Sequence, residues 1–194
     1  TRPGRGLPEE HEWTFIRKDG TRVPVMLSVS ALHDELNRIT GYVGMTYDLT
    51  ARNNAEEALR KSAAEIMDLY DHAPCGYHSL DGNGLIVRMN ETELEWLGYR
   101  PEEVIAKMKF RDLLTPEAAE AFETRFPRFK RTGFFHNAES RLVRKDGREL
   151  PVLISATAIT DAAGNFVMSR SVMTDITEIK KLQARERMRA LVLE

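Results

Sequence analysis

Alternating apolar and polar residues late in the chain predict three consecutive β-strands. They run over residues 137–143, 149–159 and 166–176, and Asp146-Gly147 between the first two is typical of a tight hairpin turn. Val, Ile, Met and Thr are frequent in these strands, which suits a sheet with one buried face. The pattern therefore predicts an antiparallel meander.

The same pattern occurs once more, nearer the start of the chain. Arg17-Lys18-Asp19-Gly20 recurs 127 positions later as Arg144-Lys145-Asp146-Gly147, and Asp48-Leu49-Thr50 recurs at the same offset as Asp175-Ile176-Thr177. A register kept without a gap over about forty residues indicates a duplicated unit. The first copy starts near residue 12, so it is expected to hold only the three closing strands.

Two charged segments without Gly or Pro predict helices over residues 51–70 and 178–194. In the first, the larger apolar residues make a stripe of coiled-coil width; in the second, they recur at three- to six-residue steps. These residues are Leu59, Ile66, Leu69 and Tyr70 in the first helix, and Ile179, Leu182, Met188 and Leu191 in the second. Charged helices of this length are marginal alone in water, so we expect a homodimer held by these helices and by the sheet surfaces.

Between the two helices the chain predicts two strands followed by short helices. Asp81-Gly82-Asn83-Gly84 is a turn between the strands, and Asn90 is placed to cap a helix that Gly98 ends. Thr115-Pro116 is placed to begin a longer helix that runs to about residue 130.

Composition and charge narrow the range of partners. The 194 residues are 42% hydrophobic and 30% charged with a net charge of -2, which argues against nucleic acid as a partner. A single cysteine, Cys75, excludes an internal disulfide and fits a reducing compartment. No apolar run is long enough for a membrane span. We therefore expect a cytoplasmic fragment of a longer protein.

The order of two strands, short helices and three strands resembles the PAS sensor domain. The turn Asp81-Gly82-Asn83-Gly84 followed by Asn90 is similar to the opening of that family, and the run from Gly98-Tyr99 to Ile105 is similar to its middle motif, with Ala106 where the family usually has Gly. The Arg144–Gly147 hairpin and the closing Asp175-Ile176-Thr177 resemble its last motifs. The resemblance implies an α+β fold with a five-stranded antiparallel sheet and short helices on one face.

This resemblance covers the whole chain and implies four parts. Residues 1–50 would be the last three strands of a first PAS domain, 51–70 a linker helix, 71–177 a complete PAS domain, and 178–194 an exit signalling helix. The incomplete first unit should expose Trp13, Phe15, Val25, Leu27 and Val29 on one face. We expect a neighbouring chain or the linker helix to cover that face, or the unit to be poorly ordered.

A sheet covered by helices on one face encloses a small apolar space, which side chains or a ligand can fill. The candidate lining residues are His78, Met89, Trp96, Phe110, Leu113, Phe122, Phe126, Phe134, Leu142, Ile154 and Met173. The sequence favours a space without cofactor, and haem, a non-covalent flavin or a small organic acid are the alternatives. A haem ligand would be expected on helix 116–130, which has no histidine, so His78 is the candidate in its place. Cys75 lacks the Asn-Cys-Arg-Phe-Leu context of light-oxygen-voltage domains.

No catalytic or metal-binding motif stands out. The chain lacks a Gly-x-Ser-x-Gly nucleophile motif, a P-loop and a dinucleotide fingerprint, and the turn at Asp81 lacks the Glu that a calcium loop needs. We therefore expect no enzyme activity from this fragment.

The closing Asp-Ile-Thr motif is the expected joint between sheet and exit helix. We expect Asp175 to pair with Arg144 or Arg148 and Thr177 to cap the helix, with Asp48 and Thr50 as their counterparts in the first copy. The predicted function is a sensory input module that acts through this joint on a C-terminal effector. Residues 181–191 look like the helix that leads into bacterial sensor histidine kinases, which favours a kinase effector. The alternatives are a constitutive interaction module without ligand and the input to a cyclase.

Overall fold

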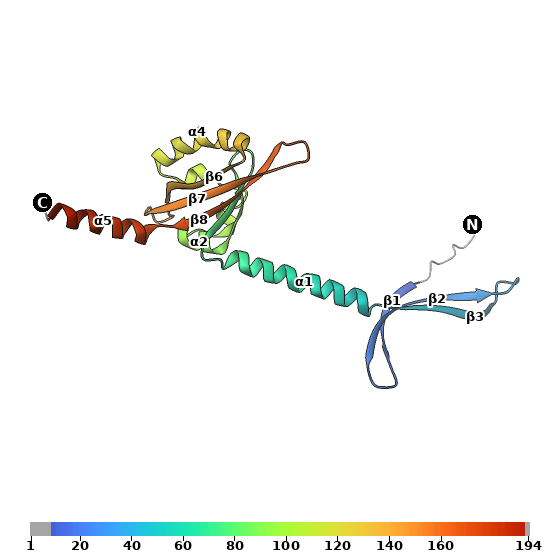
Figure 1. Ribbon diagram of the computed structural model, residues 1–194. Helices are drawn as coiled ribbons and strands as arrows, with labels where there is room; N and C mark the ends of the chain where they lie inside the picture. Colours follow the sequence, from blue (N-terminus) through green and yellow to red (C-terminus); the bar gives the residue numbers. More distant parts are fainter. Residues whose placement is uncertain (1–8, 193–194) are drawn as a thin grey trace. The chain divides into compact units, whose positions relative to one another are not determined.

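The computed structural model describes residues 9–192 and contains two antiparallel sheets (Figure 1). The chain divides into two compact units between Glu65 and Ile66. In the first unit, β1 (Glu9–Ile16), β2 (Arg22–His33) and β3 (Ile39–Asp48) form a three-stranded sheet in the order β1-β2-β3. Helix α1 (Thr50–Asp71) follows, close to the predicted 51–70.

The second unit has the predicted five-stranded antiparallel sheet, which confirms the α+β fold class. Its strands lie in the order β5-β4-β8-β7-β6. They are β4 (Gly76–Leu80), β5 (Ile86–Met89), β6 (Phe134–Val143), β7 (Glu149–Thr160) and β8 (Phe166–Asp175). Helix α5 (Thr177–Val192) continues directly from β8.

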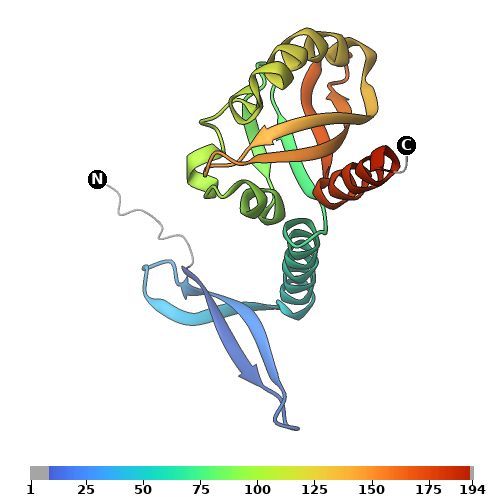
Figure 2. The same ribbon diagram turned by 90° about the vertical axis from the view of Figure 1, so that its left-hand side faces the viewer.

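The helices between β5 and β6 pack over the sheet, where α4 crosses the strands (Figure 2). They are α2 (Glu91–Leu97), α3 (Pro101–Val104), the 3-10 turn η1 (Phe110–Leu113) and α4 (Pro116–Thr132). Their core joins residues of both layers, such as Leu97 and Val104 from the helices with Leu142, Leu150 and Met173 from the sheet. This core separates water from the centre of the sheet and fixes where a cavity can lie.

The ends of the helices lie where the capping residues predict them. The Asn90 side chain accepts a hydrogen bond from Glu93 N, and Gly98 ends α2 in the left-handed conformation at φ 77°. Thr115 caps α4 by accepting from Ala118 N, and Pro116 occupies the first turn.

Strand β6 places two neighbouring phenylalanines differently. Phe134 is 59% exposed, whereas its neighbour Phe135 packs against the core. The register between β6 and β7 shifts between Phe135 and Ala138, where Asn137 takes a positive φ of 52°. This bulge adds a residue to β6 and reverses the alternation of its faces, so Phe135 packs against the core while Phe134 stays largely exposed.

The first unit leaves much of one sheet face open. Trp13 is 57% exposed, and Phe15 and Val29 are also exposed, although Val25 is buried and Leu27 half-buried. Helix α1 has no buried residue, so the linker helix does not cover this face. The expectation that the linker helix covers this face is therefore wrong.

None of the described helices is both long and apolar enough to cross a bilayer.

The backbone conformation at Ala106 shows why a glycine is favoured at this position of the motif. It follows α3 with a positive φ of 58°, and its N–H donates to Ile86 O at 2.8 Å, which holds the turn against β5. A side chain in this left-handed conformation costs about 1–2 kcal/mol, which glycine avoids. The usual glycine of the family therefore has a direct conformational reason.

Ala106→Gly should raise the free energy of unfolding by about 0.5–1 kcal/mol, because the relief of strain exceeds the added chain entropy. Urea denaturation of both proteins measures the change. Ala119→Gly, inside α4, is the matched control and should lower it by about 1 kcal/mol. A destabilised Ala106→Gly would contradict this account.

Candidate functional site

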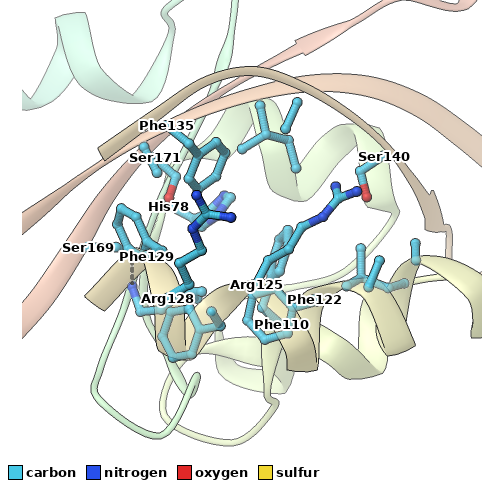
Figure 3. A pocket seen from close by; sticks show the side chains of 18 of the residues that line it. His78, Phe110, Phe122, Arg125, Arg128, Phe129, Phe135, Ser140, Ser169 and Ser171 are labelled. Carbon is cyan, nitrogen blue, oxygen red and sulfur yellow. Dashed lines mark hydrogen bonds between the residues drawn. The ribbon is translucent and has the colours of Figure 1, made fainter. Parts of the chain in front are cut away.

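A cavity of about 550 Å³ lies between α4 and the large sheet (Figure 3). Its aromatic wall comes largely from α4, where Phe122, Phe126 and Phe129 follow the i, i+4, i+7 spacing of one helix face. Phe110 continues the wall, with ring centroids 5.6 Å from Phe122, and Phe122 stacks on Phe126 at 4.9 Å. The volume falls within the range of about 300–1,000 Å³ found for small-molecule sites.

The structure divides the expected lining residues between the cavity and the core. The residues that line the cavity are His78, Phe110, Phe122, Phe126, Phe134 and Ile154. Met89, Leu113, Leu142 and Met173 lie in the buried core instead, and Trp96 packs against that core.

Several lining residues have no counterpart in the sequence-based list. They are chiefly polar: Arg125 and Arg128 on α4, Glu139 and Ser140 on β6, and Ser169 and Ser171 on β8. A search for apolar residues passes over them. The helical period could have identified the two arginines, because Arg125 and Arg128 lie next to the stripe of Phe122, Phe126 and Phe129 on α4.

His78, at the wall of the cavity, is paired with a buried carboxylate. His78 Nδ1 hydrogen-bonds Glu93 Oε2 at 3.1 Å and lies 2.9 Å from Oε1, and both side chains are almost completely buried. The His78 ring also stacks on Phe110 with centroids 4.4 Å apart. Glu93 Oε1 has no hydrogen-bond partner among the described residues. The histidine is therefore held on one edge by a carboxylate and on one face by an aromatic ring.

Gly76 makes room for this pair. A Cβ at position 76 would lie 2.9 Å from Glu93 Oε2 and 3.1 Å from Glu93 Cβ, closer than side chains tolerate. Glu93 is not among the candidate site residues predicted from the sequence. Its spacing of four from Leu97 places it on the inward face of α2, which was the available signal.

Among residues 9–192 there is no group of three or more His, Cys, Asp or Glu that could hold a metal ion. Cys75 does not line the cavity; its carbonyl oxygen accepts from the Asn90 amide at 3.0 Å.

The joint between sheet and exit helix is built around Asp175. Asp175 Oδ1 accepts from Thr177 N at 2.7 Å, so Asp175, and not Thr177, caps α5. Asp175 Oδ2 lies 4.0 Å from Arg144 Nη2, at the limit of an ion pair. Arg148 pairs instead with Asp146 at 2.6 Å. Asp175 is a better cap because its carboxylate reaches a free N–H at the positive end of the helix.

The first unit repeats this joint. Asp48 Oδ1 accepts from Thr50 N at 2.8 Å, and Asp48 Oδ2 lies 3.8 Å from Arg17 Nη2. Hydrogen bonds from the Thr50 side chain and backbone lower the pKa of Asp48 below its usual value. The duplicated sequence therefore places the same three groups together at the start of both helices.

A second contact joins α5 to the wall of the cavity. Lys180 Nζ on α5 lies 2.6 Å from Glu139 Oε2 on β6. A groove beside α5 is lined by Lys180 and Arg187, and it shares Arg125, Glu139 and Ser140 with the cavity. The exit helix and the cavity therefore have a common wall.

One protein family matches most of this chain. The family described as PAS domain matches residues 2–51 and 74–178. The phosphoserine phosphatase RsbP of Bacillus subtilis (strain 168) is 33% identical over 93 residues, which are 48% of this chain and 23% of that protein. This chain therefore spans less than a quarter of the relative that it matches.

Two solved structures show the same fold. The PAS domain of an HTR-like protein from Haloarcula marismortui is 21% identical with a TM-score of 0.52, and the match covers 64% of this chain and 99% of that one. The PAS domain of a protein from Colwellia psychrerythraea is 20% identical with a TM-score of 0.54, over 62% and 98% of the two chains.

The buried pair yields a test by double-mutant cycle. His78→Ala and Glu93→Ala should each lower the free energy of unfolding by about 3 kcal/mol, because the remaining partner stays buried and unpaired. The double variant should lose less than the sum, with a coupling energy of about 2 kcal/mol. Urea denaturation of the four proteins measures it.

The exposed pair Lys181–Glu178 on α5, 2.8 Å apart, provides the matched cycle. Its coupling should stay below about 0.5 kcal/mol because water screens it. Additive losses at His78 and Glu93 would show that the two groups do not support each other.

Proposed function

Because the chain belongs to the PAS domain family, we propose that it is a sensory input module of a longer signal-transduction protein. A change in the cavity would move the wall that it shares with the groove beside α5, and α5 would carry that movement to an output domain. The observation that carries this proposal is the shared wall of Arg125, Glu139 and Ser140.

Two polar contacts support α5 as the transmitting element. The Lys180–Glu139 pair ties the first turn of α5 to β6, and the Asp175 carboxylate ties the same turn to β8. The side chains of both pairs are partly exposed, so each contributes little to stability, about 0–1 kcal/mol. Contacts of this strength suit an element that has to change its position.

We also propose that the two sheets are PAS units in series, the first represented by its three closing strands. The repeated Asp48–Thr50 joint supports this, as does the sequence repeat at an offset of 127 positions. At that offset the sheet face that holds Phe15, Val25 and Leu27 corresponds to Leu142, Val152 and Ile154, which are buried beneath the helices of the second unit. A neighbouring chain is the proposed cover for the open face.

The proposed output domain is a histidine kinase, because residues 181–191 look like the helix that leads into such kinases. A serine phosphatase is the second candidate, since the relative RsbP is a phosphoserine phosphatase. Phosphate incorporation from ATP and phosphate release from a phosphoserine peptide, both measured on the full-length protein, distinguish the two. A cyclase output would give neither.

Asp175→Ala tests the joint. It removes the cap of α5 but leaves the sheet intact, so the melting temperature should fall by only a few degrees. In the full-length protein it should abolish the difference in output with and without the stimulus, because coupling depends on the joint.

Asp146→Ala is the matched control. Like Asp175→Ala, it removes a carboxylate that pairs with an arginine of the β6–β7 hairpin. The partner is Arg148, and the Asp146 carboxylate does not contact α5. Its response should equal that of the wild type. If Asp175→Ala also responds normally, or simply unfolds, the joint does not transmit the signal; an equal output in all states would favour a constitutive interaction module.

Dimerisation through α1 and α5 is part of the same proposal. Leu59, Ile66 and Leu69 on α1 are all exposed, and so are Ile179 and Leu182 on α5. Leu59 and Ile66 are one heptad apart, the spacing at which two helices pack against each other. A partner helix would bury these side chains.

Sedimentation equilibrium at tens of micromolar should show a dimer for the wild type and a monomer for Leu59→Glu/Ile66→Glu. Leu36→Glu is the control, since Leu36 lies in a loop and is as exposed as Leu59, 72% in each case. A monomeric wild type, or a dimer that survives the double substitution, would exclude dimerisation through α1.

A further inference from the structure

Two arginines at the mouth of the cavity carry unopposed positive charge. Arg125 and Arg128 share the stripe of α4 that also holds Ala121 and Thr132, spaced i, i+4, i+7 and i+11. Figure 3 shows both side chains rising from α4 toward the sheet. Within residues 9–192, neither guanidinium has an ion pair or a hydrogen bond.

The acidic side chain that lines the cavity does not neutralise them. Glu139 is engaged by Lys180 Nζ at 2.6 Å, so its charge is already offset. On α4 itself, Glu123 is paired with Arg111. The cavity mouth therefore has an excess of positive charge that favours an anion.

The side chains that line the cavity favour a ligand with an apolar body and a polar group. Phe110, Phe122, Phe126 and Phe129 line it with ring centroids 4.9–6.1 Å apart, which suits a flat aromatic ring. Ser171 also lines it and is only 4% exposed, yet its hydroxyl forms no hydrogen bond within the described part of the chain. The hydroxyl is therefore available to a polar group of a bound ligand.

We propose that this cavity binds an aromatic carboxylate. The carboxylate pairs with Arg125 and Arg128, whose planar guanidinium groups match its two oxygens, and the ring packs against the phenylalanine wall. This inference rests on the proposed function in taking the cavity as the input site, and it adds the chemical class of the ligand.

Isothermal titration calorimetry with 2-naphthoate on the chain of residues 1–194 tests the proposal. The neutral isostere 2-naphthamide has the same ring without the charge, and it should bind about tenfold more weakly. Raising the salt from 50 to 500 mM should weaken binding of the acid and leave the amide unchanged. Decanoate tests the preference for an aromatic body and should bind more weakly than 2-naphthoate.

Arg125→Gln and Arg128→Gln should each weaken 2-naphthoate binding about tenfold, with unchanged melting temperatures because both side chains are exposed and unpaired. Arg131→Gln on the same helix does not line the cavity and should bind like the wild type. Equal binding of acid and amide, an equal loss in Arg131→Gln, or no binding at all would overturn the proposal.

The two proposals fail separately. The titration measures binding without an output domain, and the Asp175→Ala comparison measures the output of the full-length protein, whatever the chemical class of its stimulus. If Asp175→Ala loses its response as expected but 2-naphthoate does not bind, the input module stands and the ligand class is rejected.

Discussion

One buried amide holds together the start of the large unit. Asn90 is completely buried, and its side chain accepts from Tyr77 N at 2.9 Å and Glu93 N at 3.2 Å while donating to Tyr70 O at 2.9 Å and Cys75 O at 3.0 Å. The end of α1, the start of β4 and the first turn of α2 therefore meet on one side chain. Because all four groups would otherwise be unsatisfied in the interior, their positions are set together. This fixes where Glu93 lies, and Glu93 in turn fixes His78 at the cavity wall.

Single side chains also join strands to helices at the ends of both three-stranded meanders. Asp175 and Asp48 each close a third strand and cap the following helix, so the direction of each helix is tied to the last residue of its sheet. A carboxylate does this with a short side chain and no buried partner. The core of the large unit can therefore stay rigid while the helix that leaves it is held by only a few surface contacts.

Much of this architecture could be predicted from the sequence because it depends on local rules. The capping residues Asn90 and Thr115 and the turn glycines follow from nearby residues, and the register kept at an offset of 127 positions identifies the second three-stranded meander. The cavity was harder to predict for two reasons. A bulge at Asn137 reverses the faces of β6, so Phe135 lines the cavity as well as the expected Phe134. The buried Glu93 was missed because a charged residue at a helix start is usually solvated, and only the distant Gly76 and His78 make room for it.

The bulge in β6 also affects how this cavity should be compared with those of other family members. Beyond Asn137, toward the start of the strand, the inward positions are shifted by one residue relative to a regular strand. Two relatives that differ only in this extra residue would present different side chains to their ligands at positions that a sequence alignment treats as equivalent. Ligand preference in such proteins is therefore better compared from strand register than from aligned position, and a single inserted or deleted residue near the start of β6 is enough to alter it.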